Sequence, residues 1–533
     1  MTDRKSKLIR HIEGGSARAL LVYPEFPKTF WSFKYALTFI SKKSGMTPLG
    51  LLTVAAMLPK DWDKKLVDLN VGALDDEDLL WADYVFISAM DIQRRSAKIV
   101  LDRCRRFGVT TVIGGPLVSS DPFEFAGATH LLLNEGELTI PAFVADIENN
   151  CPKHVYDANG WADLSKTPVP AWELINTKDY ACLNIQYSRG CPFDCEFCDI
   201  TSLYGHTPRT KSAGQVIAEL EAIYKTGFRG GVFFVDDNFI GNRKKLKEEV
   251  LPRLIDWTRK KNYPFDFLTE VSINLADDEG LMRLMVRAGF KSVFVGIETV
   301  DEKSLTECNK MQNKNRDMLE NVKKMQRMGL QVQGGFIVGF DSDNPNIFDR
   351  LIRFIQESGI VTAMVGLLNA PRRTRLYERL KSEGRISSDF SGNNTDLSIN
   401  FMPRMNVNTL LAGYREIIST IYAPAQYYKR VKTFLREYRP LRLPARLCPE
   451  NIGAFFKAVF RLGLLGRERA HFWGLLFWSL FNRPSAFPMA VSLSIYGYHF
   501  RKVFEPLGQP QASGTAAYGL ASPRRLKHEK SVQ

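Results

Sequence analysis

The chain has 533 residues, 45% of them hydrophobic, and carries a formal net charge of +14. This length suggests about three domains at roughly 150 residues each, and the composition is that of a large soluble enzyme. The opening residues 1–18 are polar and mixed in charge and show no apolar core of a signal peptide, so a cytoplasmic protein is expected. The basic residues are concentrated at the other end, where residues 426–533 hold 18 Lys and Arg against 5 Asp and Glu.

Residues 19–150 are predicted to form an α/β domain with an open parallel sheet of the doubly wound, Rossmann-like type. Five short apolar runs alternate with longer mixed segments, as is typical of βα units. The runs are 19–23, 65–69, 84–89, 110–114 and 130–133. Helices are expected at 49–58 and 94–107.

Small and polar residues follow the last two of these predicted strands. They are Gly114, Gly115 and Pro116 after the fourth strand, and Asn134, Glu135, Gly136 and Glu137 after the fifth. In such sheets, ligands bind at the carboxyl ends of the strands. Glycines let a ligand approach the backbone closely because they lack a Cβ. Ordinary tight turns are the alternative interpretation.

A linker without clear periodicity is expected at 151–180, and it leads to an apolar run at 183–187 and then to three cysteines. Cys191, Cys195 and Cys198 have the spacing C-x3-C-x2-C. A [4Fe-4S] cluster has four irons, so three thiolates leave one iron open to a ligand that is not protein. A closed zinc site would need four ligands, and the remaining cysteines are scattered singly. A disulfide is disfavoured in a reducing compartment.

Residues 181–405 are predicted to fold as six βα units, a partial (β/α)6 TIM-type barrel. The expected strands are 183–187, 231–235, 266–273, 292–297, 331–338 and 361–367. The expected helices are 212–224, 243–261, 279–288, 317–328 and 346–357. Catalytic groups of such barrels lie at the carboxyl ends of the strands. A polar loop at 391–400 is expected over the barrel mouth.

Polar or glycine-rich residues occur at those strand ends. Asp237 and Asn238 follow the second strand, and Glu298 closes the fourth. The fifth strand contributes Gly335, Ile337 and Gly339. Any one carboxylate could be a solvated loop residue. Together with the cysteines they indicate a single site.

Residues 406–507 are predicted to form a mostly helical domain, aromatic and basic, and the tail 508–533 is expected to be disordered. The run 471–481 is apolar but shorter than the roughly 20 residues that a bilayer requires. It predicts either a buried core helix or a helix in a membrane interface. Nucleic acid is not expected as a partner, because no RNA-binding module is recognisable.

The cysteine motif, with an aromatic residue just before its last cysteine, resembles the signature of radical S-adenosylmethionine (SAM) enzymes. Phe197 fills that aromatic position. The resemblance implies that the three cysteines ligate a [4Fe-4S] cluster and that SAM binds the open iron. Reductive cleavage of SAM then gives a radical that abstracts hydrogen from a substrate. An iron-sulfur electron-transfer or sensing protein is the alternative from another class.

The same resemblance assigns roles to the strand-end residues of the barrel. It implies that Asp237 and Asn238 lie near the methionine amino group of SAM, and that Glu298 lies near the ribose. The fifth strand, with Gly335, Ile337 and Gly339, is implied to contact adenine.

An α/β domain that precedes a radical SAM core resembles the cobalamin-binding domain of B12-dependent radical SAM enzymes. Position 134 departs from that family, since it is Asn where glycine is commoner. Relatives that keep such a domain without its cofactor leave cyclisation, rearrangement or carbon-carbon coupling as alternative reactions. The resemblance implies that the corrin is lined by Pro48, Gly50, Ser88, Met90, Gly114, Gly115, Pro116, Glu135, Gly136 and Glu137.

From about residue 19 to 505 the chain resembles a three-part architecture that includes the hopanoid C-2 methylases. The stretch 496–501, Tyr-Gly-Tyr-His-Phe-Arg, is similar to the close of their C-terminal domain. The resemblance implies methyl transfer to an unactivated ring carbon of a membrane lipid. The expected partners are a lipid or small-molecule substrate, an electron donor such as flavodoxin or ferredoxin, and the inner face of the cytoplasmic membrane.

Overall fold

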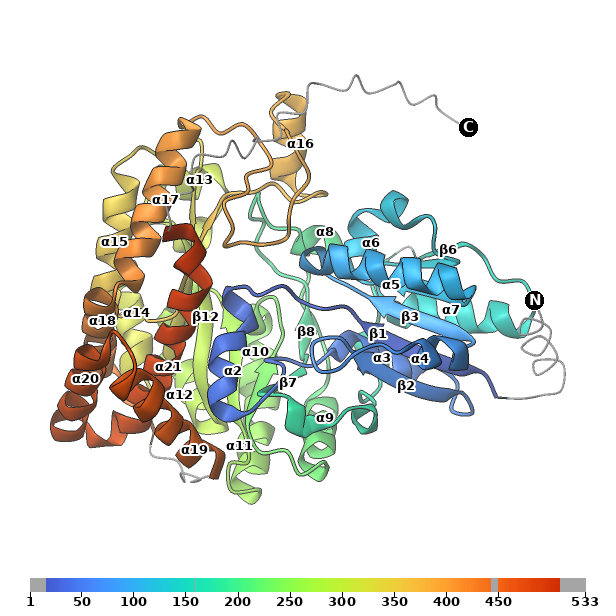
Figure 1. Ribbon diagram of the computed structural model, residues 1–533, viewed down its shortest axis with the longest axis horizontal. Helices are drawn as coiled ribbons and strands as arrows, with labels where there is room; N and C mark the ends of the chain where they lie inside the picture. The colour runs from blue at the N-terminus through green and yellow to red at the C-terminus, as the bar shows by residue number, and fades with distance from the viewer. Residues whose placement is uncertain (1–15, 159, 442–448, 509–533) are drawn as a thin grey trace.

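The structure is a computed structural model, and it describes residues 16–158, 160–441 and 449–508. An N-terminal α/β domain lies on one side of a half barrel, and the C-terminal helices pack on the other side (Figure 1). The predicted tails 1–18 and 508–533 lie almost wholly outside the described residues.

The N-terminal sheet is parallel throughout, with strand order β2-β1-β3-β4-β5-β6. Its strands are β1 Arg18–Tyr23, β2 Asp63–Asp68, β3 Tyr84–Ser88, β4 Thr110–Gly114, β5 His130–Leu133 and β6 Val155–Asp157. Its main helices are α3 Leu49–Met57, α4 Asp76–Trp81, α5 Arg94–Phe107, α6 Pro116–Ser120 and α7 Gly136–Glu148. The predicted doubly wound domain is confirmed, but its sheet extends past residue 150. Strand β6 lies in the predicted linker, and its three residues are too few to give a periodic pattern.

The second sheet is the predicted six-stranded half barrel, parallel, in the order β14-β13-β12-β11-β10-β7. Its strands are β7 Cys182–Ile185, β10 Gly231–Phe234, β11 Asp266–Val271, β12 Phe290–Glu298, β13 Gln331–Val338 and β14 Ala363–Leu367. Its outer helices are α9 Ala213–Lys225, α11 Leu251–Lys260, α12 Glu279–Ala288, α14 Met318–Arg327 and α15 Ile347–Ser358. All strands point the same way, so their carboxyl ends meet at one mouth.

Segments from both ends of the chain pack against the open side of this barrel, between the edge strands β7 and β14. Helix α2 Lys34–Ile40 lies beside helix α21 Phe487–Phe504 (Figure 1). The Phe30 ring stacks on Phe500 at 4.3 Å between centroids. Trp31 enters the barrel, where its ring lies 5.4 Å from that of Phe294 and its Nε1 donates to Met364 Sδ. The sequence did not predict this closure.

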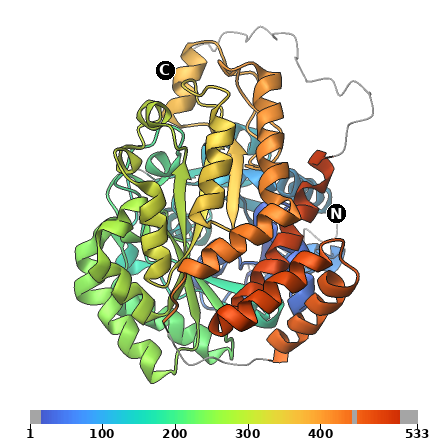
Figure 2. The same ribbon diagram turned by 90° about the vertical axis from the view of Figure 1, so that its left-hand side faces the viewer.

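The C-terminal domain is helical, as predicted, and it covers the outside of the barrel (Figure 2). Its helices are α17 Val407–Tyr422, α18 Pro424–Glu437, α19 Pro449–Ala458, a π-helical turn Val459–Leu464, α20 Arg469–Asn482 and α21. The run 471–481 lies in α20, where Phe472 and Leu476 are buried as in a core helix, while Phe477 and Phe481 are exposed. No described helix is long and apolar enough to cross a membrane.

Candidate active site

The three cysteines lie on a loop that leaves the carboxyl end of β7 and returns at residue 209. Two short antiparallel strands, β8 Ser188–Arg189 and β9 Arg209–Thr210, form the stem of this loop. Within it, the N–H of Cys191 donates to Gly205 O, and the N–H of Cys198 donates to Cys195 O. Gly190 has φ +92, and a Cβ there would lie 2.8 Å from Gly205 O. Only glycine fits this turn immediately before Cys191.

The donor set of the loop fits an iron-sulfur cluster with one open iron. All three thiols are free, with Cys195 buried and Cys191 and Cys198 half-buried. Burial raises the pKa of the Cys191 and Cys198 thiols, so binding iron would have to release their protons. Cys308 lies behind the loop, and its buried thiol is directed to Leu305 O.

The carboxyl end of β10 is bonded directly to the cluster loop. Asp236 accepts hydrogen bonds from the Tyr187 N–H and the Ser188 hydroxyl, and Asp237 accepts one from the Gly190 N–H at 3.1 Å. Burial raises the pKa of Asp236 to about 7 and that of Asp237 to about 6. Asn238 is buried and donates to Ser272 at 3.4 Å. The predicted residue Asp237 thus contacts the cluster loop next to Cys191, whereas Asn238 contacts Ser272, which follows β11.

An ion pair at the end of β12 brings a further residue to the site. Glu298, at φ +62, accepts from Lys310 Nζ at 2.7 Å, and both side chains are nearly buried. Lys310 Nζ also lies 5.8 Å from the Phe197 ring. Burial alone would lower the pKa of Lys310, but Glu298 and the cysteine thiols raise it above its ordinary value. Sequence analysis missed this lysine, because its only signal was a position twelve residues beyond a strand-end carboxylate.

A glycine makes room for this ion pair. A Cβ on Gly296 would lie 2.3 Å from Glu298 Oε1 and 2.9 Å from Lys310 Nζ. On the neighbouring strand, a Cβ on Gly335 would lie 2.7 Å from the Phe294 ring. Gly339 has φ +110 and its N–H donates to Asp343. Contact of adenine with Gly335, half-buried Ile337 and Gly339 stays a prediction.

The carboxyl edge of the N-terminal sheet brings several of the predicted corrin-lining residues together. A Cβ on Gly115, which has φ +91, would lie 2.7 Å from Ser88 Oγ, and one on Gly50 would lie 4.0 Å from the same atom. A Cβ on Gly114 would lie 2.8 Å from Leu132 O. The chain's own packing therefore requires Gly114 and Gly115, whatever ligand binds. Asn134 has φ +65, a conformation that asparagine tolerates better than most residues.

The edge is compatible with a flat, largely apolar ligand. The side chains at this edge are small where Gly50, Ser88 and Gly115 come together, so a ligand can approach the backbone there. Met90, two residues after Ser88, is 44% exposed. Pro48 is the N-cap residue of α3, and Pro116 is the first residue of α6. His130 and His154 are the histidines in the described part of this domain, and they lie at the start of β5 and before β6, at the opposite edge.

The carboxylates at the end of β5 bind the cluster loop. Glu137 accepts from both terminal nitrogens of Arg189, at 2.7 and 2.9 Å. Glu135 accepts from Arg189 at 2.9 Å and from Arg209 at 2.9 and 3.0 Å. Burial raises the pKa of Glu137, but the Arg189 hydrogen bonds bring it down to about 2. Gly136 begins α7 between them. Sequence analysis missed both arginines.

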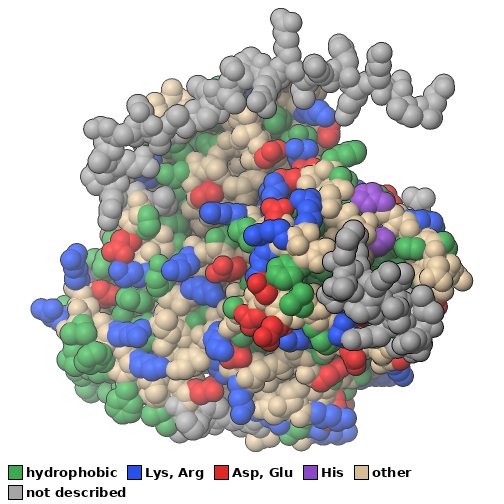
Figure 3. Space-filling view, turned by 45° about the vertical axis from the view of Figure 1, so that its right-hand side comes forward, with side chains coloured by type: hydrophobic (Ala, Val, Ile, Leu, Met, Phe, Trp, Pro, Cys, Tyr) green, Lys and Arg blue, Asp and Glu red, His purple; other side chains and the backbone are tan. Residues whose placement is uncertain are grey.

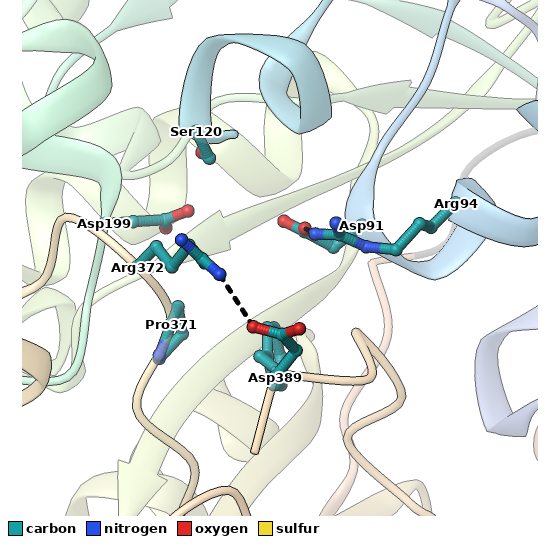
Figure 4. A pocket seen from close by; sticks show the side chains of 8 residues that line it. Asp91, Arg94, Ser120, Asp199, Pro371, Arg372 and Asp389 are labelled. Atoms are coloured by element: carbon teal, nitrogen blue, oxygen red, sulfur yellow. Dashed lines mark hydrogen bonds and ion pairs between the residues drawn. The ribbon is translucent and has the colours of Figure 1, made fainter. Parts of the chain in front are cut away.

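A polar pocket lies where the N-terminal domain, the cluster loop and the barrel mouth meet (Figure 4). Asp91 and Arg94 of the N-terminal domain lie on one side, and Asp199, which directly follows Cys198, lies across from them. Arg372, beyond β14, binds Asp389, which lies just before the polar loop 391–400, at 2.7 Å. Burial, with the charge of Asp91, raises the pKa of Asp199. The carboxyl edges of the two sheets therefore face each other.

A three-cysteine loop at the carboxyl end of a six-stranded half barrel defines a radical SAM enzyme. The model of the Radical SAM superfamily matches residues 185–355, and a domain of unknown function, DUF4070, matches residues 374–511. The chain is 39% identical to an uncharacterized methyltransferase of Synechocystis sp. over 97% of both chains. It is 34% identical to the hopanoid C-2 methylase of Rhodopseudomonas palustris, over 86% of this chain and 88% of that one.

Solved structures share the fold at low identity. The cobalamin-dependent radical enzyme OxsB, with aqua-cobalamin and SAM bound, aligns with TM-score 0.59 at 14% identity over 94% of this chain and 80% of that one. The radical SAM methyltransferase TsrM from Kitasatospora setae aligns with TM-score 0.58 at 14% identity over 88% of this chain and 100% of that one. The chain belongs to the radical SAM superfamily, in the methyltransferase family that contains the hopanoid C-2 methylase. Its cosubstrate is SAM, and its metal centre is a [4Fe-4S] cluster.

Proposed function

We propose that this protein binds cobalamin in its N-terminal domain and methylates an unactivated ring carbon of a hopanoid-like lipid. The observation that carries the proposal is the meeting of the two carboxyl edges at one junction, beside the cluster loop. Bound cobalamin would supply a cobalt-borne methyl group there. The identity to a hopanoid C-2 methylase supports the choice of lipid. A saturated ring carbon has no proton acidic enough for base catalysis, which favours radical chemistry.

The residues of the barrel mouth suit the charges of SAM. The cysteines would hold the cluster, which supplies the electron for cleavage once an external donor such as flavodoxin or ferredoxin has reduced it. The Lys310 ammonium is placed to attract the SAM carboxylate, and Asp237 is placed to accept from its amino group. Glu298 would accept from the ribose hydroxyls.

The first experiment tests the radical step. Protein reconstituted with iron and sulfide under anaerobic conditions should release 5'-deoxyadenosine from SAM when dithionite is added. Alanine at any of Cys191, Cys195 or Cys198 should abolish the product, whereas alanine at Cys151, which is exposed and distant in the sequence, should leave it unchanged. An intact cluster without product would contradict the assignment.

The second experiment tests the substrate. Lipid mass spectrometry of a deletion strain should show the loss of a methylated hopanoid and the accumulation of a species about 14 mass units lighter, one CH2 less. Protein purified after growth with B12 should show a cobalamin absorption spectrum. Unchanged lipids with an altered water-soluble metabolite would exclude a lipid substrate. A protein that cleaves SAM but lacks the cobalamin spectrum would favour an N-terminal domain without cobalamin and a different radical reaction.

We also propose that the C-terminal domain attaches the protein to the inner face of the cytoplasmic membrane. Large apolar side chains project from α19, the π-helical turn and α20, with exposed fractions of 65% for Phe456, 56% for Phe460 and 80% for Phe481. Exposed Arg461 and Arg467 alternate with them. Basic and apolar groups side by side suit an anionic lipid surface. Figure 3 shows green and blue side chains intermixed along the lower left edge of the molecule.

Flotation with vesicles tests this attachment without reference to activity. The wild-type protein should float with vesicles of phosphatidylglycerol and phosphatidylcholine, and less with phosphatidylcholine alone. The double variant F456S/F460S should stay in the soluble fraction. F123S is the matched control, since Phe123 is 91% exposed on the N-terminal domain. Equal flotation of all three proteins would place the attachment elsewhere.

A further inference from the structure

Two arginines lie opposite each other at the stem of the cluster loop. In the antiparallel pair of β8 and β9, Arg189 is paired with Arg209, and Ser188 with Thr210. Like charges directly opposite across a two-strand ladder destabilise it. The stem is two residue pairs long, so its own ladder supplies few hydrogen bonds to offset that repulsion. Cys191 follows Arg189 by two residues, so the stem fixes where the cluster ligands begin.

The charges that neutralise this pair come from the N-terminal domain. Glu135, whose side chain is 1% exposed, accepts from both arginines. Its other contact is with the Ala162 N–H at 2.7 Å. Glu137 adds a bidentate pair with Arg189 alone. Glu135 is thus the one carboxylate of this network that bridges the two strands of the stem.

We propose that Glu135 is a positioning residue that holds the stem of the cluster loop closed by bridging Arg189 and Arg209. The segment 134–137 at the carboxyl edge of the N-terminal sheet is then part of the frame of the iron-sulfur site. This inference rests on the radical SAM assignment and not on the proposed lipid. It gives the N-terminal domain a role in holding the cluster whatever ligand that domain binds.

The Glu135 ion pairs are not needed merely to hold the N-terminal domain on the barrel, because other contacts already join the two domains. Thr47 Oγ1 accepts from the Asn184 N–H at 3.0 Å, and Tyr180 donates to Asp68 at 2.9 Å. These contacts join the N-terminal domain to the barrel near β7 without touching the stem. Removing one partner of a buried charged network leaves the other charges buried and uncompensated. Loss of the Glu135 charge should therefore destabilise the stem of the cluster loop locally.

The experiment compares E135Q with T47V, which removes a contact between the domains away from the stem. In metal-free protein, amide hydrogen exchange of the peptide 188–210 should be about tenfold faster in E135Q and unchanged in T47V, since tenfold corresponds to about 1.4 kcal/mol. After reconstitution, E135Q should lose iron to a chelator several-fold faster than the wild type and T47V. Equal exchange and equal iron loss in E135Q and the wild type would overturn the proposal.

A second variant separates charge repulsion from general damage. In E135Q/R209Q the uncompensated arginine pair is gone, because Arg189 keeps its bidentate partner Glu137 and faces an uncharged side chain at position 209. We expect the double variant to regain slow exchange of the stem and slow iron loss. If the double variant behaves like E135Q or worse, the bridging role is wrong, even where E135Q alone folds poorly.

Discussion

Several buried carboxylates lie at the barrel mouth, and burial raises the pKa of Asp236, Asp237 and Glu270. Burial raises the pKa of Glu270, at the end of β11, to about 8, with the charges of Asp237, Asp236 and Glu298 adding to the effect. Of the nearby cations, Lys310 lowers the pKa of Glu270, and Arg189 lowers that of Asp237. SAM carries a sulfonium and an ammonium group. A binding site rich in carboxylates therefore suits this cosubstrate, since the ligand can supply the positive charge that the side chains lack.

Glutamine at Glu270 should stabilise the unliganded protein at alkaline pH. The native carboxyl binds its proton up to about pH 8, and the unfolded one only to about 4.5. Between these values the native state holds more protons, so this group's contribution to stability falls as pH rises. The glutamine side chain in E270Q does not titrate. The unfolding free energy of E270Q should therefore exceed that of the wild type by an amount that grows to the order of a few kcal/mol by about pH 8. Thermal unfolding from about pH 5 to 9 measures this, with exposed Glu148→Gln as control.

Loss of the Lys310 charge should weaken SAM binding more than it weakens the fold. K310Q leaves Glu298 without its 2.7 Å partner and removes the attraction for the SAM carboxylate. Charge-assisted hydrogen bonds contribute about 1.5–3 kcal/mol, so the Kd for SAM should rise about 10- to 100-fold. Equilibrium binding to the reconstituted protein measures the change. K303Q, at an exposed position of the same connection after β12, should match the wild type, and an unchanged Kd for K310Q would place the carboxylate elsewhere.

At the scale of helices and strands, two helical glycines of the C-terminal domain should respond oppositely to alanine. A Cβ on Gly497 of α21 would lie 2.4 Å from the ring of Tyr427, which is fully buried and donates to Leu493 O. G497A should therefore cost about 1–3 kcal/mol. Gly474 of α20 is exposed with no atom within 4 Å, and G474A should stabilise by roughly 0.5–1 kcal/mol. Denaturant melts of both variants test the packing of α21 on α18.

The sequence predicted those strands whose residues form continuous apolar runs. Strands such as β1 and β5 are buried along nearly their whole length and form clear apolar runs, and all six barrel strands and five of the six N-terminal strands were predicted. Strand β6 was missed because it is three residues long and begins with the exposed Val155. The position of α2 was missed because its partners in α21, such as Tyr498 and His499, lie more than 400 residues away in the sequence.

The candidate site was predictable where one local motif carries the chemistry, as in the cysteine loop. The Glu298–Lys310 pair and the bridging of Arg189 and Arg209 by Glu135 depend on tertiary packing, which no local pattern specifies. The glycine signal was ambiguous: Gly114 and Gly115 suggested close approach of a ligand, yet contacts with Leu132 and Ser88 already require them.

At the scale of the whole molecule, a segment near each end of the described chain packs against the same open side of the barrel. Phe30 contacts Phe500 and Phe504 by its ring, and its carbonyl oxygen lies 2.9 Å from His499 Nε2. One continuous apolar core runs from the segment around Phe30 through the barrel to α21. The C-terminal helices are therefore expected to unfold together with the barrel and not as a separate unit.

Removal of α21 should destroy the barrel's cooperative transition. A chain ending at Arg483 loses the partners of Phe30 and exposes the side of the barrel that Trp31 and α2 cover. Calorimetry should show one transition for the full chain and none, or aggregation, for the truncated one, because burial of these aromatic side chains contributes about 1.5–3 kcal/mol each. A chain ending at residue 508 keeps α21 and should melt like the full chain. A truncated chain that retains the barrel's transition would show instead that α21 is an independent cap.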